Sequence, residues 1–301
     1  MNRIIRKLFI VLLLVLVCGC ADNTDNEEIV FPIDARVSYL GPEGTYTQEA
    51  AEFFFGDNGE YIAEDSVSRA IDDVIDGISD YAVIPQENTI GGAVTNYLDA
   101  LIEKDDVYVV GEIILPISQT LMGIEGASLD DIKVVCSHAQ GIAQSEVWRK
   151  DNIPDAVTEE MSSTAAAVSY VAEMGDKSIA AIGASRAGEL YGLSILAENV
   201  QITDNNKTRF YVLSDSPISR GNHGVFVVQC EANRIDDIIV ELNKVGLEFV
   251  CIHDRPEGSL LGSYYYVIEV ENNSGINKSQ LNKLDKFSEL RFLGCFDVKE
   301  K

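Results

Sequence analysis

The stretch VSYLGPEGTYTQEAAEFFF, residues 37–55, contains the unit from which this fold is built. Val37 to Leu40 predicts a strand, Gly41 to Thr45 a turn, and Gln48 to Phe55 a helix. Such turns place a small polar side chain where it can cap a helix N-terminus. The same order of strand, small polar residue and helix recurs up to Ser185, at Asn88-Thr89, Ser137-His138, Ser162-Ser163-Thr164 and Ser185 itself.

These five turns favour a pocket for a small anion. Alternating strands and helices predict an α/β layered sheet, in which ligands bind at the carboxyl ends of the strands. A capped helix N-terminus directs backbone N–H groups and positive potential outward, which suits a carboxylate or phosphate. Proteins of this class also cap helices where nothing binds, so a single turn is weak evidence. Five together indicate a binding site.

Composition limits the partners of this site. The chain has 301 residues, is 46% apolar and contains only seven prolines, which is typical of a globular protein. Its net charge of −26 disfavours nucleic acid and acidic membrane surfaces. A small anion is repelled as well, so its site must be local, built from helix N-termini and a few cations, of which Arg209 is the first candidate.

The N-terminus reads as a targeting segment. Basic residues precede an apolar run from Leu8 to Val17, which is short for a membrane span and typical of a signal peptide. Cys18-Gly19-Cys20 then resembles a bacterial lipobox, which predicts a signal peptide over 1–19, acylation of Cys20 and a polar tether over 20–34. This makes the protein extracytoplasmic and lipid-anchored. An uncleaved anchor, or a wrongly chosen start codon and hence a cytoplasmic protein, is the alternative.

The remaining cysteines do not form a metal motif. No Cys-x-x-Cys pair or histidine cluster is present, so we expect no metal site. Buried free thiols are the simplest interpretation. A disulfide between Cys230 and Cys295 is an alternative if the protein lies outside the cytoplasm. The four cysteines concerned are Cys136, Cys230, Cys251 and Cys295.

Two folded units are expected, over 35–215 and 220–301, with Ser214 to Asn222 as a polar linker. In the first unit, further helices are predicted over Ser68–Gly77, Ala93–Ile102, Gln140–Lys150, Ala165–Met174 and Arg186–Tyr191, and strands over Tyr81–Pro85, Val107–Leu115, Ile132–Cys136, Glu159–Met161, Ile179–Gly183 and Arg209–Leu213. The tail has the β-α-β-β-α-β order of ferredoxin-like folds, over Gly224–Cys230, Ile235–Val245, Phe249–His253, Ser263–Val270, Ser279–Phe287 and Phe292–Val298.

Several of these motifs together resemble prephenate dehydratases that carry a C-terminal regulatory ACT domain. The resemblance covers the chain from about Val37 to its end. It implies an α/β fold, in which a two-lobed catalytic domain similar to type 2 periplasmic binding proteins is followed by a ferredoxin-like (βαββαβ) ACT domain. The motifs that carry it are Tyr39 to Thr47, Pro85-Gln86-Glu87-Asn88-Thr89, Ser137-His138-Ala139-Gln140, Ser163-Thr164-Ala165 and Asn206-Lys207-Thr208-Arg209-Phe210.

The resemblance implies dehydration and decarboxylation of prephenate to phenylpyruvate, for L-phenylalanine biosynthesis, without a cofactor. In the family the threonine of Thr-Arg-Phe is linked to proton delivery at the leaving hydroxyl, which makes Thr208 catalytic. Arg209 is expected to fix the carboxylates of this dicarboxylate substrate. An ordinary strand start with an exposed arginine is the alternative for these two residues.

Further residues match family positions that line the cleft. The expected substrate-binding residues are Asn88, Thr89, Ser137, Thr164 and Phe210, although each polar one of them suits a helix cap equally well. Glu43 and Glu87 are expected to stabilise turns, because a carboxylate beside a dianion is repelled. A structural role is at least as good an interpretation of His138 as a catalytic one.

Departures from the family pattern concern both domains. His138-Ala139-Gln140 replaces the family's His-Pro-Gln, and Gln119 stands where many members have histidine. In the tail, Asp254, Arg255 and Pro256 match the end of the regulatory Glu-Ser-Arg-Pro motif. Ala232 to Ile235 replaces Pro-Gly-Ala-Leu, however, so the close backbone approach that glycine permits is lost and we expect weak or absent inhibition by phenylalanine.

Alternatives to the dehydratase remain open at this stage. A lipid-anchored protein that binds a small carboxylate in the same cleft without catalysis fits the lipobox, whereas the intact Thr208-Arg209 pair favours the enzyme. A sensory module with an inactive first domain, and a dehydratase that uses arogenate, are further readings. We expect a homodimer formed through the tail, because small sheets of this kind leave an edge or a face for a partner.

Overall fold

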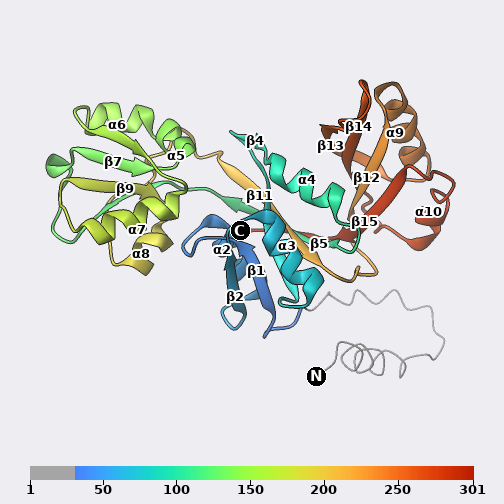
Figure 1. Cartoon of the computed structure of the whole chain (residues 1–301), viewed down its shortest axis with the longest axis horizontal. Helices are drawn as coiled ribbons and strands as arrows, with labels where there is room; N and C mark the ends of the chain where they lie inside the picture. The colour runs from blue at the N-terminus through green and yellow to red at the C-terminus, as the bar shows by residue number, and fades with distance from the viewer. Residues whose placement is uncertain (1–30) are drawn as a thin grey trace. The chain divides into compact units, whose positions relative to one another are not determined.

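The structure is a computed structural model that describes residues 31–301, and its largest sheet has seven strands (Figure 1). β1 lies parallel to both β2 and β3, and its three central residues, including the polar Ser38, are buried, as expected for an interior strand in a parallel arrangement. The order is β16-β5-β11-β3-β1-β2, with β4 paired to β3. The strands are β1 (Arg36–Leu40), β2 (Glu60–Glu64), β3 (Tyr81–Asn88), β4 (Gly92–Ala93), β5 (Tyr108–Pro116), β11 (Lys207–Ser214) and β16 (Val298–Glu300).

Three helices pack on this sheet and complete what we call the first lobe. α3 buries Ala70, Ile71 and Val74, which the period of 3.6 residues places on one face. These side chains share a core with Ala82 and Ile84 of β3. The helices are α2 (Tyr46–Phe55), α3 (Val67–Asp76) and α4 (Thr95–Glu103).

The second lobe is built around a five-stranded sheet of order β10-β6-β9-β7-β8. Figure 1 shows α6 and α7 on opposite faces of this sheet, each with its own apolar core. Its strands are β6 (Thr120–Gly123), β7 (Val134–Ser137), β8 (Val157–Glu160), β9 (Ile179–Gly183) and β10 (Ser194–Ala197). Its helices are the 3₁₀ turn η1 (Leu129–Asp131), α5 (Ala139–Gln144), α6 (Glu146–Asn152), α7 (Thr164–Met174) and α8 (Ser185–Tyr191).

The chain crosses between the lobes twice, after β5 and before β11. The two crossing segments hydrogen-bond to each other: Ile117 N donates to Asn206 O at 2.8 Å and Val200 N to Gln119 O at 2.9 Å. Two adjacent connections of this kind join two separately packed lobes. The predicted two-lobed α/β fold is confirmed.

The tail forms a four-stranded antiparallel sheet of order β13-β14-β12-β15. Phe226, Ile238 and Ile268 belong to the core between this sheet and its helices. The β-α-β-β-α-β order confirms the predicted ferredoxin-like fold. Its elements are β12 (His223–Glu231), the 3₁₀ turn η2 (Ala232–Arg234), α9 (Ile235–Lys244), β13 (Glu248–Pro256), β14 (Ser263–Glu271), α10 (Lys278–Asn282) and β15 (Leu290–Phe296).

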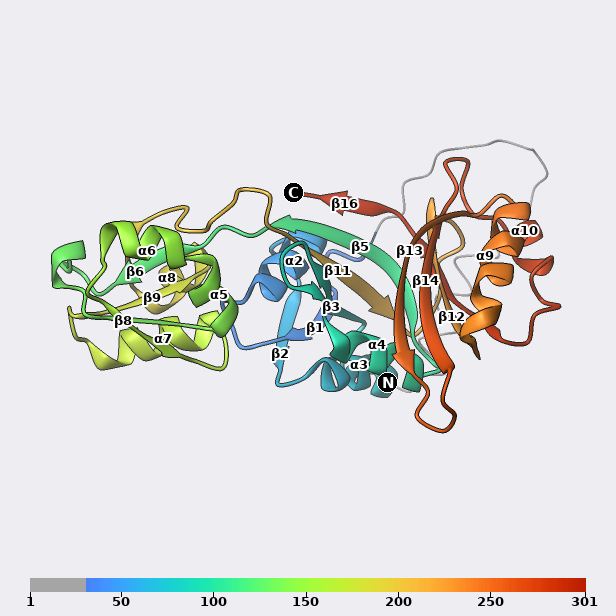
Figure 2. The ribbon, with the colours of Figure 1, turned by 90° about the horizontal axis from the view of Figure 1, so that it is seen from above.

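The last residues of the chain return to the first lobe. The single strand predicted over Phe292–Val298 is wrong, because the chain leaves the tail sheet after Phe296 and β16 pairs in parallel with β5 (Figure 2). Val298 lies opposite Glu112 in this pairing. The residues from Pro32 to Lys301 form one compact unit. The domain boundary at 215–220 therefore stays a prediction.

Other differences from the predicted elements are local. The single helix predicted over Gln140–Lys150 is divided between α5 and α6 at Ser145, whose hydroxyl donates to Gly141 O at 2.8 Å and competes with the helical pattern. The helix predicted over Ser279–Phe287 ends at Asn282. β2, β6 and β10 were not predicted: β2 has only three apolar residues, Tyr61 to Ala63, between two glutamates, and the other two have only four residues each.

Several predictions concern residues at the edge of, or beyond, the described part of the chain. The signal peptide over 1–19, Cys20 and most of the tether over 20–34 lie outside residues 31–301. Within that range, no helix is both long and apolar enough to cross a bilayer. Cys230 and Cys295 are free thiols, as are Cys136 and Cys251, so the disulfide considered above is not formed.

Candidate functional site

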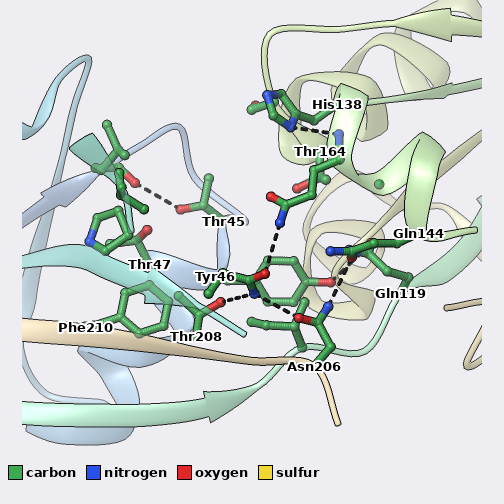
Figure 3. A pocket seen from close by; sticks show the side chains of 18 of the residues that line it. Thr45, Tyr46, Thr47, Gln119, His138, Gln144, Thr164, Asn206, Thr208 and Phe210 are labelled. Atoms are coloured by element: carbon green, nitrogen blue, oxygen red, sulfur yellow. Dashed lines mark hydrogen bonds between the residues drawn. The ribbon is translucent and has the colours of Figure 1, made fainter. Parts of the chain in front are cut away.

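A cavity of about 260 Å³ opens where the two lobes and the crossing segments meet (Figure 3). Among the described residues that line it there is no Asp, Glu, Lys or Arg. One part of the lining is apolar, and the rest carries amides, hydroxyls and the imidazole of His138. It consists of Leu40, Gly41, Thr45, Tyr46, Thr47, Pro85, Asn88, Val94, Ile117, Gln119, His138, Gln140, Gly141, Gln144, Ser162, Ser163, Thr164, Asn206, Thr208 and Phe210.

Three helices begin at the cavity with side-chain caps. Thr45 Oγ1 accepts from Gln48 N at 3.4 Å at the start of α2. His138 Nδ1 accepts from Gln140 N at 3.3 Å, and Ser163 Oγ from Ala166 N at 2.9 Å. Positive helix ends thus approach the cavity from both lobes. The expected caps by small hydroxyls are confirmed at Thr45 and Ser163, whereas at Ser137-His138 the cap is the imidazole of His138.

The other two predicted turns are corrected. Asn88 and Thr89 do not cap a helix, because β3 extends to Asn88 and the chain then forms β4; α4 begins later, after Val94, without a side-chain cap. Ser185 is the first residue of α8, whose N-cap is Ala184, and it does not line the cavity.

A bulge in β3 determines which side chains of this strand face the cavity. Phe210 pairs with Pro85 and Arg209 with Glu87, so Gln86 is an extra residue without a partner on β11. As a result, Pro85 and Asn88 face the cavity, while Gln86 and Glu87 both face the opposite side, where they contact Tyr211 and Arg209. The bulge thereby assigns one face of the sheet to the cavity and the other to charged groups.

Asn88 holds the hydroxyl of Thr208. Its Nδ2 donates to Thr208 Oγ1 at 2.9 Å and to Asn206 Oδ1 at 2.8 Å. Its Oδ1 accepts from the backbone N–H groups of Ile90 and Gly91 at 3.0 and 2.9 Å, and from Gln140 Nε2 at 3.0 Å. Donors around Oδ1 and acceptors around Nδ2 fix the orientation of this amide. Thr208 Oγ1 is therefore an acceptor toward Asn88, and its own proton is free for another partner.

A chain of buried amides continues this network across the cleft. Asn206 Nδ2 donates to Gln144 Oε1 at 3.0 Å, and Gln119 Nε2 donates to the same oxygen at 3.3 Å. Tyr46 extends the network from α2, with its hydroxyl donating to Ser118 O at 2.7 Å. Figure 3 shows Asn206, Gln144 and Gln119 at the side of the cavity next to Thr208. The network joins both lobes through uncharged groups only.

The structure separates the predicted substrate-binding residues into two groups. Asn88, Thr164 and Phe210 line the cavity, and so does the predicted catalytic Thr208. Thr89 does not line it, because its hydroxyl is engaged with the backbone of Asn205 and Lys207.

Ser137 also does not line the cavity. Its side chain is fully buried, and its Oγ donates to Ile182 O at 2.7 Å between β7 and β9. The expectation that Thr89 and Ser137 contact a ligand is therefore corrected: both hydroxyls are used to hold backbone segments together.

Arg209 requires the largest correction. Neighbouring residues of a strand face opposite sides, so Thr208 and Phe210 face the cavity and Arg209 faces away from it. Its Nε and Nη2 donate to the two oxygens of Glu112 at 2.8 and 2.7 Å, and Nη2 also donates to Glu269. The prediction that Arg209 fixes substrate carboxylates is wrong in this structure, because its guanidinium is held by buried glutamates.

The electrostatics of this arginine follow from its burial among carboxylates. Burial disfavours its charge, but Glu112 and Glu269 outweigh this effect and raise the pKa of Arg209. Burial raises the pKa of Glu112 to about 7, against the opposing effect of Arg209. Glu87 adds a third carboxylate at 3.6 Å from Nη1, which corrects its expected turn-stabilising role.

The predicted regulatory residues lie on β13, at an edge of the tail sheet. Asp254 is exposed, whereas Arg255 forms a two-pronged ion pair with Asp99 of α4, at 2.6 and 2.8 Å. Pro256 is the last residue of the strand. The motif therefore connects the tail to the first lobe.

Fold and site together define a two-lobed α/β protein with a polar cleft in which no Lys, Arg, Asp or Glu is found among the described lining residues, a held threonine hydroxyl and a ferredoxin-like tail. A sequence profile described as prephenate dehydratase matches residues 37–218. The chain belongs to the prephenate dehydratase family, and prephenate dehydratases are carbon–oxygen lyases.

Individual relatives agree with this assignment. The chain is 31% identical over 279 residues to a prephenate dehydratase of Methanocaldococcus jannaschii, covering 88% of this chain and 99% of that one. It is 32% identical over 241 residues to a bifunctional chorismate mutase/prephenate dehydratase of Neisseria gonorrhoeae, covering 79% of this chain and 66% of the relative's length. The solved prephenate dehydratase of Arthrobacter aurescens in complex with L-Phe has a TM-score of 0.78 at 28% identity, covering 87% and 89% of the two chains.

Sequence reasoning missed Gln144 and Asn206 as site residues. Asn206 stands two residues before Thr208, a spacing that places both on one face of an extended segment, and this signal was available. Gln144 follows Gln140 by one helical turn, which was also visible. Only the fold shows that the two amides meet.

Proposed function

We propose that the cleft is the active site for conversion of prephenate to phenylpyruvate, with Thr208 as the proton donor to the leaving hydroxyl. The observation that carries this proposal is the hydrogen bond from Asn88 Nδ2 to Thr208 Oγ1 at 2.9 Å. Because Thr208 accepts there, its O–H can donate into the cleft. A preorganised donor of this kind needs no reorientation when charge develops on the leaving oxygen.

The reaction needs little more than positioning and one proton. The bond between the ring and the hydroxyl breaks as the oxygen takes the proton of the Thr208 hydroxyl and leaves as water, and Thr208 recovers a proton from solvent. The ring carboxylate leaves as carbon dioxide, and the electron pair of that carbon–carbon bond completes the aromatic ring. Aromatisation supplies the driving force, so the protein must chiefly hold the dianion in a reactive conformation.

The helix ends and amides of the cleft suit the two carboxylates. α2 and α7 present their N-termini at Thr45 and Ser163, from opposite lobes. Gln140 and Gln144 add side-chain amides from the second lobe. Among the described residues, no Lys or Arg lines the cavity, so these dipoles and the His138 imidazole are the groups available to bind the dianion. Leu40, Pro85 and Phe210 supply apolar surface for the ring.

The same lining favours prephenate over arogenate. Arogenate carries an ammonium group where prephenate carries a ketone, and a desolvated ammonium needs an anionic partner. None of the described lining residues is acidic. We expect the chain from Ala21 onward to use prephenate with a kcat/KM roughly tenfold or more above that for arogenate. Competition assays that follow phenylpyruvate and phenylalanine together measure this ratio, and a preference for arogenate would contradict the argument.

A non-catalytic carboxylate-binding or sensory protein is the second candidate. The lipobox-like Cys18-Gly19-Cys20 is the observation that favours it, since export is not expected of a biosynthetic enzyme. Calorimetry distinguishes the two. Heat of binding followed by unchanged prephenate in solution supports the binder, and steady heat of turnover supports the enzyme.

We propose that the protein is an extracytoplasmic lipoprotein anchored through Cys20. The support is the basic and apolar leader before Cys18-Gly19-Cys20. Two acyl chains on one cysteine give stable membrane attachment, whereas one is marginal. The wild-type chain is expected in the membrane fraction and the Cys20→Ser variant outside it. If the two chains show the same fractionation and the same mass, the proposed lipid anchor is contradicted.

We propose further that the tail is an ACT-type regulatory domain and forms a homodimer. Its ferredoxin-like order supports the first statement. The second is supported by the exposed edge strand β13, where Phe249 and Val250 are each 38% exposed. With Ala232 to Arg234 as a 3₁₀ turn in place of the family's glycine segment, we still expect weak or absent inhibition by phenylalanine. Light scattering should give the mass of two chains; a monomeric mass argues against the dimer.

A further inference from the structure

Arg209 lies at the centre of an ion-pair cluster, the Arg209 cluster, whose other members are Glu87, Glu112 and Glu269. They come from four strands: β11, β3, β5 and, for Glu269, β14 of the tail. The side chains of Glu112 and Glu269 are each only 1% exposed, and that of Arg209 is 21% exposed. One guanidinium therefore links the strand of Thr208 to its neighbours in the first lobe and to the tail sheet.

Glu269 has more hydrogen-bond partners than a simple ion pair requires. It accepts from Arg209 Nη2 at 2.5 Å and from the hydroxyl of Tyr211 at 2.5 Å. The thiol of Cys251 donates at 3.2 Å and Gln86 Nε2 at 3.4 Å. Burial raises the pKa of Glu269, but Arg209, Tyr211 and Cys251 outweigh this effect and lower it, which favours the carboxylate form. A buried carboxylate with four donors is held in one position.

The Arg209 cluster faces away from the cleft but lies next to Thr208, the proposed proton donor, along β11. Thr208 and Arg209 are consecutive in β11, which is hydrogen-bonded to β3 on one side and to β5 on the other. The bidentate contact with Glu112 fixes Arg209 to β5, and the contact with Glu269 fixes it to the tail. A shift of the arginine is therefore passed through one peptide unit to Thr208.

We propose that Glu269, a residue of the tail domain, is a positioning residue for Thr208 and acts through Arg209. This inference rests on the proposed function, since it takes Thr208 as the proton donor. The tail thereby contributes to the geometry of an active site that it does not touch. A displacement of about 1 Å in a reacting group can cost on the order of 10²-fold in rate, so a small movement of β11 is sufficient.

The test compares the full chain carrying Glu269→Gln with the wild type. The variant keeps the shape of the side chain but replaces the charge that holds Arg209. We expect kcat for prephenate to fall roughly tenfold while KM changes by less than about twofold, because the cleft lining is untouched. Glu271→Gln is the matched control: it removes the same charge two residues along β14, and Glu271 is not a member of the Arg209 cluster. The control should leave both constants unchanged.

A double-mutant cycle separates positioning from a general structural role. In the Thr208→Val background, Glu269→Gln should cost little further rate, because the group that it positions is already absent. An equal loss in both backgrounds would overturn the inference. If thermal melting shows that the Glu269→Gln variant is not folded, Glu269→Asp is used in its place. This variant keeps the charge but moves the carboxylate by one methylene. Its kcat should fall several-fold at constant KM.

The outcomes distinguish this inference from the proposed function. A wild-type chain that converts prephenate, together with a Glu269→Gln variant as active as Glu271→Gln, overturns the positioning role and leaves the dehydratase assignment intact. A wild-type chain that does not convert prephenate overturns the assignment, and the positioning role falls with it.

Discussion

Thr208→Val should abolish most turnover of prephenate while leaving its binding nearly unchanged. Valine preserves the shape and the β-branched preference of the strand but removes the only hydroxyl that Asn88 holds at 2.9 Å. Loss of a positioned proton donor typically costs about 10²–10⁴ in rate. Steady-state kinetics of phenylpyruvate formation give kcat, and calorimetry with prephenate gives the affinity of the variant.

The control for this substitution is Thr158→Val, which makes the same chemical change on the exposed strand β8 of the second lobe. It should leave kcat and affinity unaffected. If Thr208→Val reduces kcat by well under tenfold, the hydroxyl is structural and the proton must come from elsewhere. If it weakens binding as much as turnover, Thr208 contributes to holding the substrate instead.

Asn88→Asp should be nearly as damaging, although the two side chains have almost the same shape. In the wild-type chain the amide nitrogen of Asn88 donates to Thr208, whereas the carboxylate oxygen that replaces it in the variant can only accept. Thr208 then donates to that oxygen, and its proton is no longer directed into the cleft. A carboxylate in the cavity also repels the dianion. We expect kcat to fall by about 10²–10⁴ and KM to rise.

Asn243→Asp serves as the control for this second change. Asn243 lies on α9 of the tail, where its side chain donates to Ile239 O and is exposed. Its substitution should alter neither constant. An Asn88→Asp variant with near-normal kcat would show that the polarity of this hydrogen bond does not matter and would remove the main support for Thr208 as a donor.

The elements predicted correctly are those with strong local signals. Val37 to Leu40 is mostly apolar, with Ser38 as its one small polar residue, and Thr45 follows it at the position of a helix cap, so strand, turn and helix were all recognisable. β2 was missed because Glu60 to Glu64 has no apolar alternation and lies at the edge of the sheet. β16 was missed because three residues carry no periodic signal.

The site was predictable in part for the same reason. Asn88, Thr164 and Thr208 lie at the ends of strands or the start of a helix, where the fold class places a ligand. Ser137 occupies the same kind of position but is turned into the core, toward the carbonyl of Ile182. A small hydroxyl suits both environments, so its orientation depends on packing that no local pattern encodes.

The sequence pattern around Arg209 indicates which face of the strand this residue occupies, but not which groups lie on that face. Alternation along the strand already separates Arg209 from Thr208 and Phe210, and this argument speaks against a shared ligand. That the opposite face carries Glu112 and is covered by Glu269 of the tail depends on pairing between residues 60 and more positions apart. A dianionic substrate favoured the nearest arginine as its ligand, but the structure places the Arg209 guanidinium between Glu112 of the first lobe and Glu269 of the tail sheet.

The most direct test of the account is a mass balance on prephenate by NMR with the wild-type chain at neutral pH. Prephenate signals should disappear, and phenylpyruvate and carbon dioxide should appear in equal amounts, far faster than with the Thr208→Val variant or in an enzyme-free sample. Prephenate that binds but is recovered unchanged, with the wild type and the variant indistinguishable, would contradict it.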